Sequence, residues 1–111
     1  MAVYVSNIVI DQGFTFGATF QLGDTRTNSF LDLTNCQIES KIRKTYGSSN
    51  FVSFASSITK PKSGTITIGL EPEQTLLLKP GRYVYDVKII SNMGEYKAVE
   101  GSALVRAGVT Q

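Results

Sequence analysis

The side chains able to carry chemistry in this sequence are acids, lysines and hydroxyls. The 111 residues include no histidine, and histidine is the commonest general base and transition-metal ligand. Ser-His-Asp and Cys-His nucleophilic sites are therefore excluded. A serine-lysine pair or a pair of carboxylates is the chemistry that stays open.

Carboxylates occur in two arrangements. Glu71 and Glu73 are separated by one proline, while Asp11, Asp24 and Asp32 lie in stretches of turn-forming residues. A catalytic carboxylate pair needs a cleft that raises one pKa. A calcium site needs several oxygen ligands at close spacing, and the sequence has no Asp-x-Asp or Asp-x-Asn string. We expect no enzyme activity, no metal and no cofactor, with calcium on the loop aspartates as the alternative.

Cysteine use and charge also limit the function. Cys36 is the single cysteine and cannot form an internal disulfide, so we expect a small buried hydrophobe. Eleven basic and nine acidic residues are interspersed, without a block that would attract nucleic acid or an anionic membrane. No run approaches the roughly 20 apolar residues of a membrane span, and the N-terminus lacks the basic start of a secretory signal. These features predict a soluble protein made in the cytoplasm.

Alternating apolar and polar residues predict strands along the whole chain. We expect strands at about residues 3–10, 14–22, 36–43, 51–55, 65–70 and 83–90, and a last strand ending at 105. About seven strands with turns every ~8–12 residues predict an all-β fold, an immunoglobulin-like antiparallel β-sandwich. Between the fifth and sixth strands, a proline among acidic residues predicts about one helical turn. The prediction is one domain over residues 1–111, with a short extended tail at about 107–111.

The inward faces of these strands give a predicted core. In the second strand the phenylalanines recur at every other position, which places them on one face. The predicted core residues are Phe14, Phe16, Phe20, Ile38, Ile42, Ile66, Ile68, Leu70, Tyr83, Tyr85 and Val87.

A turn precedes the tyrosine-rich strand and resembles the tyrosine corner of immunoglobulin-like domains. Leu78, Pro80, Gly81 and Tyr83 carry this likeness. In such a corner the tyrosine ring lies in the core and its hydroxyl bonds the backbone of the preceding turn. The next position but one, a disulfide cysteine in antibody domains, is Tyr85 here, so packing alone must join the sheets. The alternative is that Tyr83 is exposed or faces a ligand.

The order of motifs resembles phage virion proteins with an immunoglobulin-like fold, including the N-terminal module of baseplate upper proteins and small capsid decoration proteins. The resemblance rests on Asp-x-Gly-Phe-Thr-Phe at 11–16, Phe-Leu-Asp-Leu-Thr-Asn at 30–35, Ile-Glu-Ser-Lys-Ile-Arg-Lys at 38–44, Pro-Gly-Arg-Tyr-Val-Tyr-Asp-Val at 80–87 and Val-Glu-Gly at 99–101. It implies a non-enzymatic building block located in the virion. Since the module stands alone, we expect a capsid decoration subunit, with a tail or baseplate subunit as the alternative.

Exposed apolar and aromatic residues are the candidate contacts with other virion proteins, namely the major capsid protein or tail and baseplate proteins. They are Val3, Tyr4, Val5, Tyr46, Val84, Ile90, Tyr96 and Val109, together with the apolar stem of Lys88. A terminal strand within residues 1–10 can also pair with a neighbouring chain, so a homo-oligomer is possible. A module that binds host glycans or a receptor through Tyr46 and Asn50 is the other function that stays open.

Overall fold

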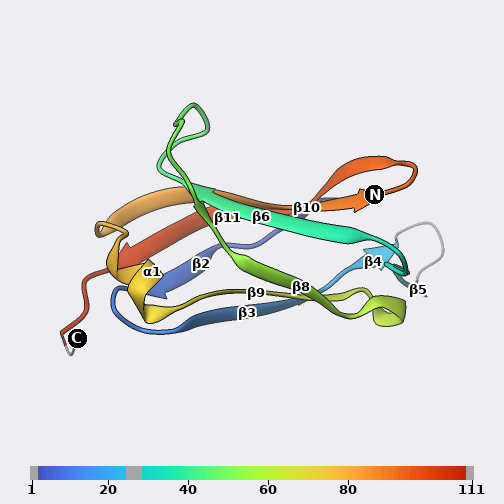
Figure 1. The fold of residues 1–111 in the computed structure, drawn as a ribbon, viewed down its shortest axis with the longest axis horizontal. Helices are drawn as coiled ribbons and strands as arrows, with labels where there is room; N and C mark the ends of the chain where they lie inside the picture. The colour runs from blue at the N-terminus through green and yellow to red at the C-terminus, as the bar shows by residue number, and fades with distance from the viewer. Residues whose placement is uncertain (1–2, 25–28, 110–111) are drawn as a thin grey trace.

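The structure, a computed structural model, describes residues 3–24 and 29–109. The all-β fold expected from the sequence is confirmed (Figure 1). The strands of this part of the chain are β1 (Tyr4–Val5), β2 (Ile8–Asp11), β3 (Phe16–Gln21), β4 (Gly23–Asp24), β5 (Ser29–Phe30), β6 (Gln37–Arg43), β7 (Val52–Ser53), β8 (Ala55–Lys60), β9 (Thr65–Leu70), β10 (Gly81–Ser91) and β11 (Gly94–Arg106). The helical elements are η1 (Pro61–Ser63) and α1 (Pro72–Leu76).

Two sheets form the sandwich. In the larger one β11 is followed by β10, β6 and β7, and both β1 and β2 pair with β11; the smaller sheet has the order β3-β9-β8. Figure 1 shows the two sheets as separate layers, with α1 at the turn that leads from β9 to β10. Immunoglobulin-like sandwiches place strands B, E and D in one sheet and C, F and G in the other. Here β3, β9 and β8 take the first set of places, and β6, β10 and β11 the second.

The N-terminal strand departs from the expected antiparallel arrangement. Both β1 and β2 run parallel to β11, so the larger sheet is mixed. Between them the strand is interrupted at Ser6 and Asn7. The hydroxyl of Tyr85 donates to the carbonyl oxygen of Ser6 at 2.6 Å, and the amide of Ser102 donates to Asn7 Oδ1 at 3.1 Å. The Ser6 amide still donates to the Glu100 carbonyl at 2.9 Å, so side chains replace only part of the ladder at this point. The register on β11 continues unchanged beyond it.

The core lies between the two sheets. Of the residues expected there, those that the structure buries are Phe20, Ile42, Ile66, Ile68, Leu70, Tyr85 and Val87. Partly buried residues packed against the core include Phe16, Ile38, Tyr83 and also Cys36. The other buried apolar residues are Ile8, Ile10, Leu22, Leu33, Phe54, Leu78, Ile89, Ala98, Val99, Ala103 and Val105.

Phe14 is a correction to the expected core, because its side chain is 44% exposed. The alternating pattern starts before the strand does, and β3 begins only at Phe16. Phe14 belongs to a turn, where its amide donates to the carbonyl of Asp11 at 3.2 Å. The turn is also tied to α1, since Thr75 Oγ1 donates to the Phe14 carbonyl at 2.9 Å. These bonds hold the residue outside the space between the sheets.

The expected strand at residues 51–55 is two strands in different sheets. β7 pairs with β6, and β8 pairs with β9. Phe54 lies at the crossing, where its amide donates to the Ser40 carbonyl at 3.0 Å and its ring is buried. β8 has only one large apolar inward residue, Ile58, because Ser56 takes the other inward place opposite Ile68. Its hydrophobic pattern was therefore too weak to be predicted.

The turn before β10 has the hydrogen bond of a tyrosine corner. The hydroxyl of Tyr83 donates to the carbonyl oxygen of Lys79, four residues upstream, at 2.8 Å. Leu78 is buried beneath the turn, and Gly81 has a φ of 144°. A left-handed φ of this kind favours glycine. This turn fixes where β10 starts, and hence the register of the central strand of the larger sheet.

We predict different costs for removing the two tyrosine hydroxyls. Tyr85→Phe should lower the free energy of unfolding by about 1–3 kcal/mol, because it leaves the Ser6 carbonyl without its donor in a partly buried place. Tyr83→Phe should cost about 0.5–1.5 kcal/mol, since water can reach the Lys79 carbonyl. Urea unfolding measures both. Equal losses of stability in the two variants would contradict the greater burial of the hydrogen bond between Tyr85 and Ser6.

Candidate functional site

The outer surface of β6, β10 and β11 carries two rows of charges. On each strand these residues alternate with, or flank, buried ones. The register places Glu39, Lys88 and Lys97 in one row across the three strands, and Lys41, Asp86 and Glu100 in the next row. We call these six residues the charged face.

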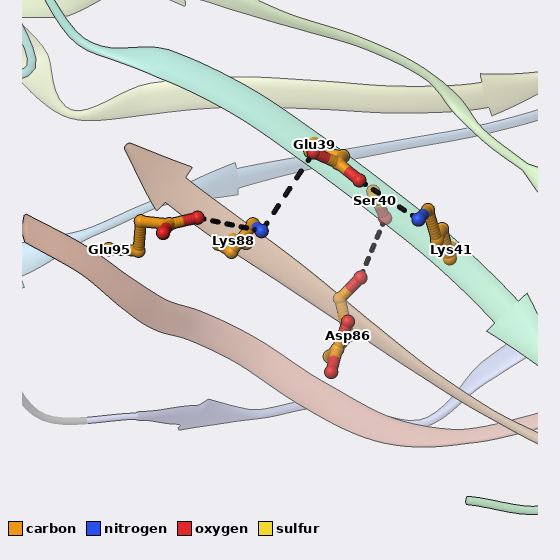
Figure 2. Close-up of polar contacts among 6 residues, drawn as sticks. All are labelled: Glu39, Ser40, Lys41, Asp86, Lys88 and Glu95. Carbon is orange, nitrogen blue, oxygen red and sulfur yellow. Dashed lines mark hydrogen bonds and ion pairs between the residues drawn. The ribbon is translucent and has the colours of Figure 1, made fainter. Parts of the chain in front are cut away.

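Ion pairs connect the first row. Lys88 Nζ lies 2.9 Å from Glu95 Oε1 and 3.9 Å from Glu39 Oε2, and Lys41 Nζ lies 3.0 Å from Glu39 Oε1. Figure 2 shows these side chains on β6, β10 and β11. Exposed pairs of this kind contribute little to stability individually. Their effect is to fix where each sign of charge lies on the surface.

Besides the pair of Lys41 with Glu39, Lys97 joins the second row to the first. Its Nζ lies 3.8 Å from Asp86 Oδ2 and 3.5 Å from Glu100 Oε2. Below the surface, the buried hydroxyl of Ser40 donates to the backbone carbonyl of Asp86 at 2.8 Å (Figure 2). This bond ties β6 to β10 directly under the charges. Side chains of both signs surround a groove of about 250 Å³ on this surface.

Three carboxyl groups, those of Asp11, Asp32 and Glu39, have lowered pKa values, whereas a catalytic acid needs a raised one. The hydrogen bond from Lys41 lowers the pKa of Glu39, and the charges of Lys41 and Lys88 lower it further. Hydrogen bonds from Arg106 and Thr34 lower the pKa values of Asp11 and Asp32, respectively. A general acid working at neutral pH needs a raised pKa. Electrostatics therefore keeps these three carboxylates ionised.

The pKa of Glu39 should rise when its partner is removed. Because the folded-state pKa lies below the ordinary value of 4.5, its stabilising effect is present at neutral pH and is lost as the pH falls through the folded-state value. NMR titration should find that Lys41→Met moves the Glu39 pKa up toward 4.5. Lys62→Met is the control, since Lys62 acts on Asp32 instead. A Glu39 pKa that is unchanged by Lys41→Met would contradict the pairing.

The aspartates considered for calcium are used in other contacts. Asp11 accepts two hydrogen bonds from Arg106, at 2.8 and 3.1 Å, and Asp32 accepts bonds from Thr34. The side chain at position 24 lies outside the described residues. In the part of the chain that the structure describes, no group of three or more acidic or cysteine residues is placed to hold a metal ion. No helix there is long and apolar enough to cross a membrane.

Exposed valines mark the edge of the larger sheet. Val5 in β1 is 71% exposed and Val9 in β2 is 48% exposed, and Val3 precedes them with 41%. We call these three residues the valine edge. Ile8 and Ile10 are buried on either side of Val9, so the strand is anchored while its outer residues face solvent.

Tyr4 and Tyr96 are held by contacts of their own. The Tyr4 ring packs edge-on against Phe20, with centroids 6.2 Å apart, although Tyr4 is half exposed. The Tyr96 hydroxyl donates to the Met93 carbonyl at 3.2 Å in the β10–β11 hairpin. Neither tyrosine lies beside the other, so the sequence candidates do not form one aromatic site.

The remaining candidates lie in three places. Val84, Lys88 and Ile90 lie on β10, at or beside the charged face. Tyr46 is exposed in the loop after β6, and together with Val84 it lines a depression of about 100 Å³. Val109 is exposed beyond the end of β11. Residues 110 and 111 of the expected tail, and residues 1 and 2 before the expected N-terminal strand, lie outside the described part of the chain.

Sequence reasoning missed Val9 and most of the charged face. Val9 could have been identified from the sequence, since it is the outward residue between two buried isoleucines on the first strand. The two rows of charges could not, because the sequence does not show which strands pair. Register between strands, which only the structure gives, decides which charges become neighbours.

Comparison with known proteins supports the fold. No protein-family model matches the chain, and neither does any curated protein. Among solved structures, the chain is similar to InlP of Listeria monocytogenes, with a TM-score of 0.50 and 15% identity over 91% of this chain and 26% of that one. It is also similar to a family 123 glycoside hydrolase from Clostridium perfringens, with a TM-score of 0.44 and 12% identity over 100% of this chain and 24% of that one. The chain thus spans about a quarter of either structure, and at such identities the likeness to InlP concerns the fold alone.

Proposed function

We propose that this chain is a non-enzymatic structural protein of a phage virion, a decoration subunit that binds the assembled capsid lattice. The resemblance of its ordered motifs to virion proteins supports the proposal. The observation that carries it is the valine edge, an anchored strand whose exposed residues are apolar. A structural protein of this kind functions by binding other proteins, so its functional regions are exposed surfaces and the edges of its sheets.

The valine edge combines two features of a docking strand. Its side chains offer exposed apolar area. Its backbone offers hydrogen-bonding groups, because within residues 3–24 and 29–109 no strand pairs with the far side of β1 or β2. Open edges of this kind accept a strand from a neighbouring chain. A capsid protein that presents an extended segment would fit it.

One observation favours a second candidate, binding of a host glycan. Tyr46 is 71% exposed in the loop after β6, and Asn50 is exposed in the same loop. Exposed tyrosine and amide groups are able to stack on and hydrogen-bond sugars. A single tyrosine provides less than the several convergent groups of an ordinary ligand site. We therefore rank this function second.

Cosedimentation tests the proposal. Purified protein is mixed with undecorated phage capsids and, separately, with phage tails. Saturable binding to capsids at a fixed ratio to the lattice is the expected result. Binding to tails alone would replace capsid decoration by a tail or baseplate role. Binding to neither would contradict a virion role, and a glycan array would then test the loop at Tyr46.

A further inference from the structure

The charges of the charged face form a pattern that is its own complement. Read from β6 through β10 to β11, the first row is negative, positive and positive, and the second row is positive, negative and negative. Each row is therefore the other with all signs reversed. Partly exposed side chains carry these charges, with exposed fractions between 31% and 45% for the six residues. They remain accessible to a partner surface.

A second copy can satisfy this pattern completely. Consider a two-fold axis that lies in the plane of the face and crosses the strands at the level of Val87. It brings each row onto the opposite row of the other copy. The contacts are Glu39 with Lys41, Lys88 with Asp86, and Lys97 with Glu100, and every one of them joins opposite charges.

The flanking rows fit the same axis. One step further out, the register gives Gln37, Ile90 and Glu95 on one side, and Arg43, Val84 and Ser102 on the other. The axis brings half-buried Ile90 onto half-buried Val84, so apolar meets apolar. It brings Gln37 onto Arg43 and Glu95 onto Ser102, so no like charges meet.

A two-fold axis that runs along β10 itself fails. It would place Lys88 on Lys88 and Asp86 on Asp86, and like charges in contact are destabilising. We propose that the outer face of β6, β10 and β11 binds the same face of a second copy, with the two-fold axis across the strands. Two-fold interfaces of homodimers require such self-complementary surfaces, and stacked sheets can align in this way about 10 Å apart.

The chemistry of the face sets the strength of the dimer. Its charges are already paired within one chain, so a second copy adds to existing pairs and does not create them. The contact area of three strands is small, and small interfaces belong to weak, transient complexes. Exposed charges are screened within about 10 Å at 0.1 M salt. We therefore expect a weak dimer that salt dissociates.

Two charge variants test the axis directly. In the Asp86→Lys variant, positions 86 and 88 of β10 are both positive. In the Lys88→Asp variant, both positions are negative. Each variant places like charges across the axis twice, so each should self-associate at least about tenfold more weakly than the wild type. Their equimolar mixture restores both opposite-charge contacts. Sedimentation velocity at low salt should therefore find a one-to-one heterodimer in the mixture alone.

Controls and contrary results are equally direct. Lys60→Asp makes the same charge change as Lys88→Asp, but on the opposite sheet, and should leave the dimer unaffected. Monomeric wild type at low salt would overturn the proposal, and so would a mixture that fails to associate or a dimer insensitive to both variants. Circular dichroism confirms that each variant is folded. Because no capsid is present, the result is independent of the proposed decoration role.

Discussion

Replacing Gly101 by alanine is expected to lower the free energy of unfolding by about 3 kcal/mol or more, at the upper end of the range for overpacking. A Cβ atom at this position would lie 2.0 Å from the carbonyl oxygen of Ser6 and 3.2 Å from the Tyr85 ring. The nearer obstacle is backbone and cannot rotate away. Relief requires the N-terminal strand to move off β11, which breaks the hydrogen bond between Tyr85 and Ser6.

The matched control for this variant is Gly17→Ala. Gly17 also lies in a strand, but an added Cβ there has no neighbour within 4 Å. We expect it to be neutral or to stabilise by up to about 1 kcal/mol, since alanine loses less backbone freedom on folding. Guanidinium unfolding of both variants measures the difference. If Gly101→Ala is no worse than Gly17→Ala, then the close approach of Ser6 to β11 is wrong.

Phe20→Ala is expected to cost about 3–5 kcal/mol, whereas Phe14→Ala should change stability by about 0.5 kcal/mol or less. Both residues belong to the same alternating run in the sequence. The structure separates them, because Phe20 is 8% exposed in β3 and Phe14 is 44% exposed in the preceding turn. The pair therefore tests where the strand starts, with the residue type held constant.

Thermal unfolding with matched urea titrations compares these two variants. Equal destabilisation would mean that β3 begins earlier and that Phe14 faces the core, as the alternating pattern alone predicts. A small effect of Phe20→Ala would instead show that the assigned register of β3 opposite β9 is wrong.

The fold could be predicted because most strands carry complete alternation. β9 has large apolar residues at all three inward positions, β6 has isoleucines on both sides of its inward Ser40, and β10 follows a recognisable turn. β8 could not be predicted, since serine takes one of its inward places. The interruption at Ser6 and Asn7 also could not, because it depends on the Tyr85 hydroxyl, far away in sequence.

The charged face needs information that alternation does not contain. On β11 the ladder shifts between Val87 and Lys88 of β10, so that Ala98 and Val99 are both buried. Strict alternation from Lys97 would place Val99 outside and Glu100 inside. The bulge reverses this, and it is the reason that Glu100 joins the second row. Because the sequence does not reveal the bulge, it also does not reveal that the six charges form two complementary rows.

The valine edge gives the most direct test of the proposed docking role. Val9→Lys places a charge on that edge, whereas Thr19→Lys adds the same charge to an exposed β-branched position of the opposite sheet. Val9 lies beyond the mirrored rows, so the test does not depend on the dimer. The measurement is saturable binding of both variants to undecorated phage capsids. The account predicts at least about tenfold weaker binding for Val9→Lys and wild-type binding for Thr19→Lys. Equal binding of both variants would contradict docking through the valine edge.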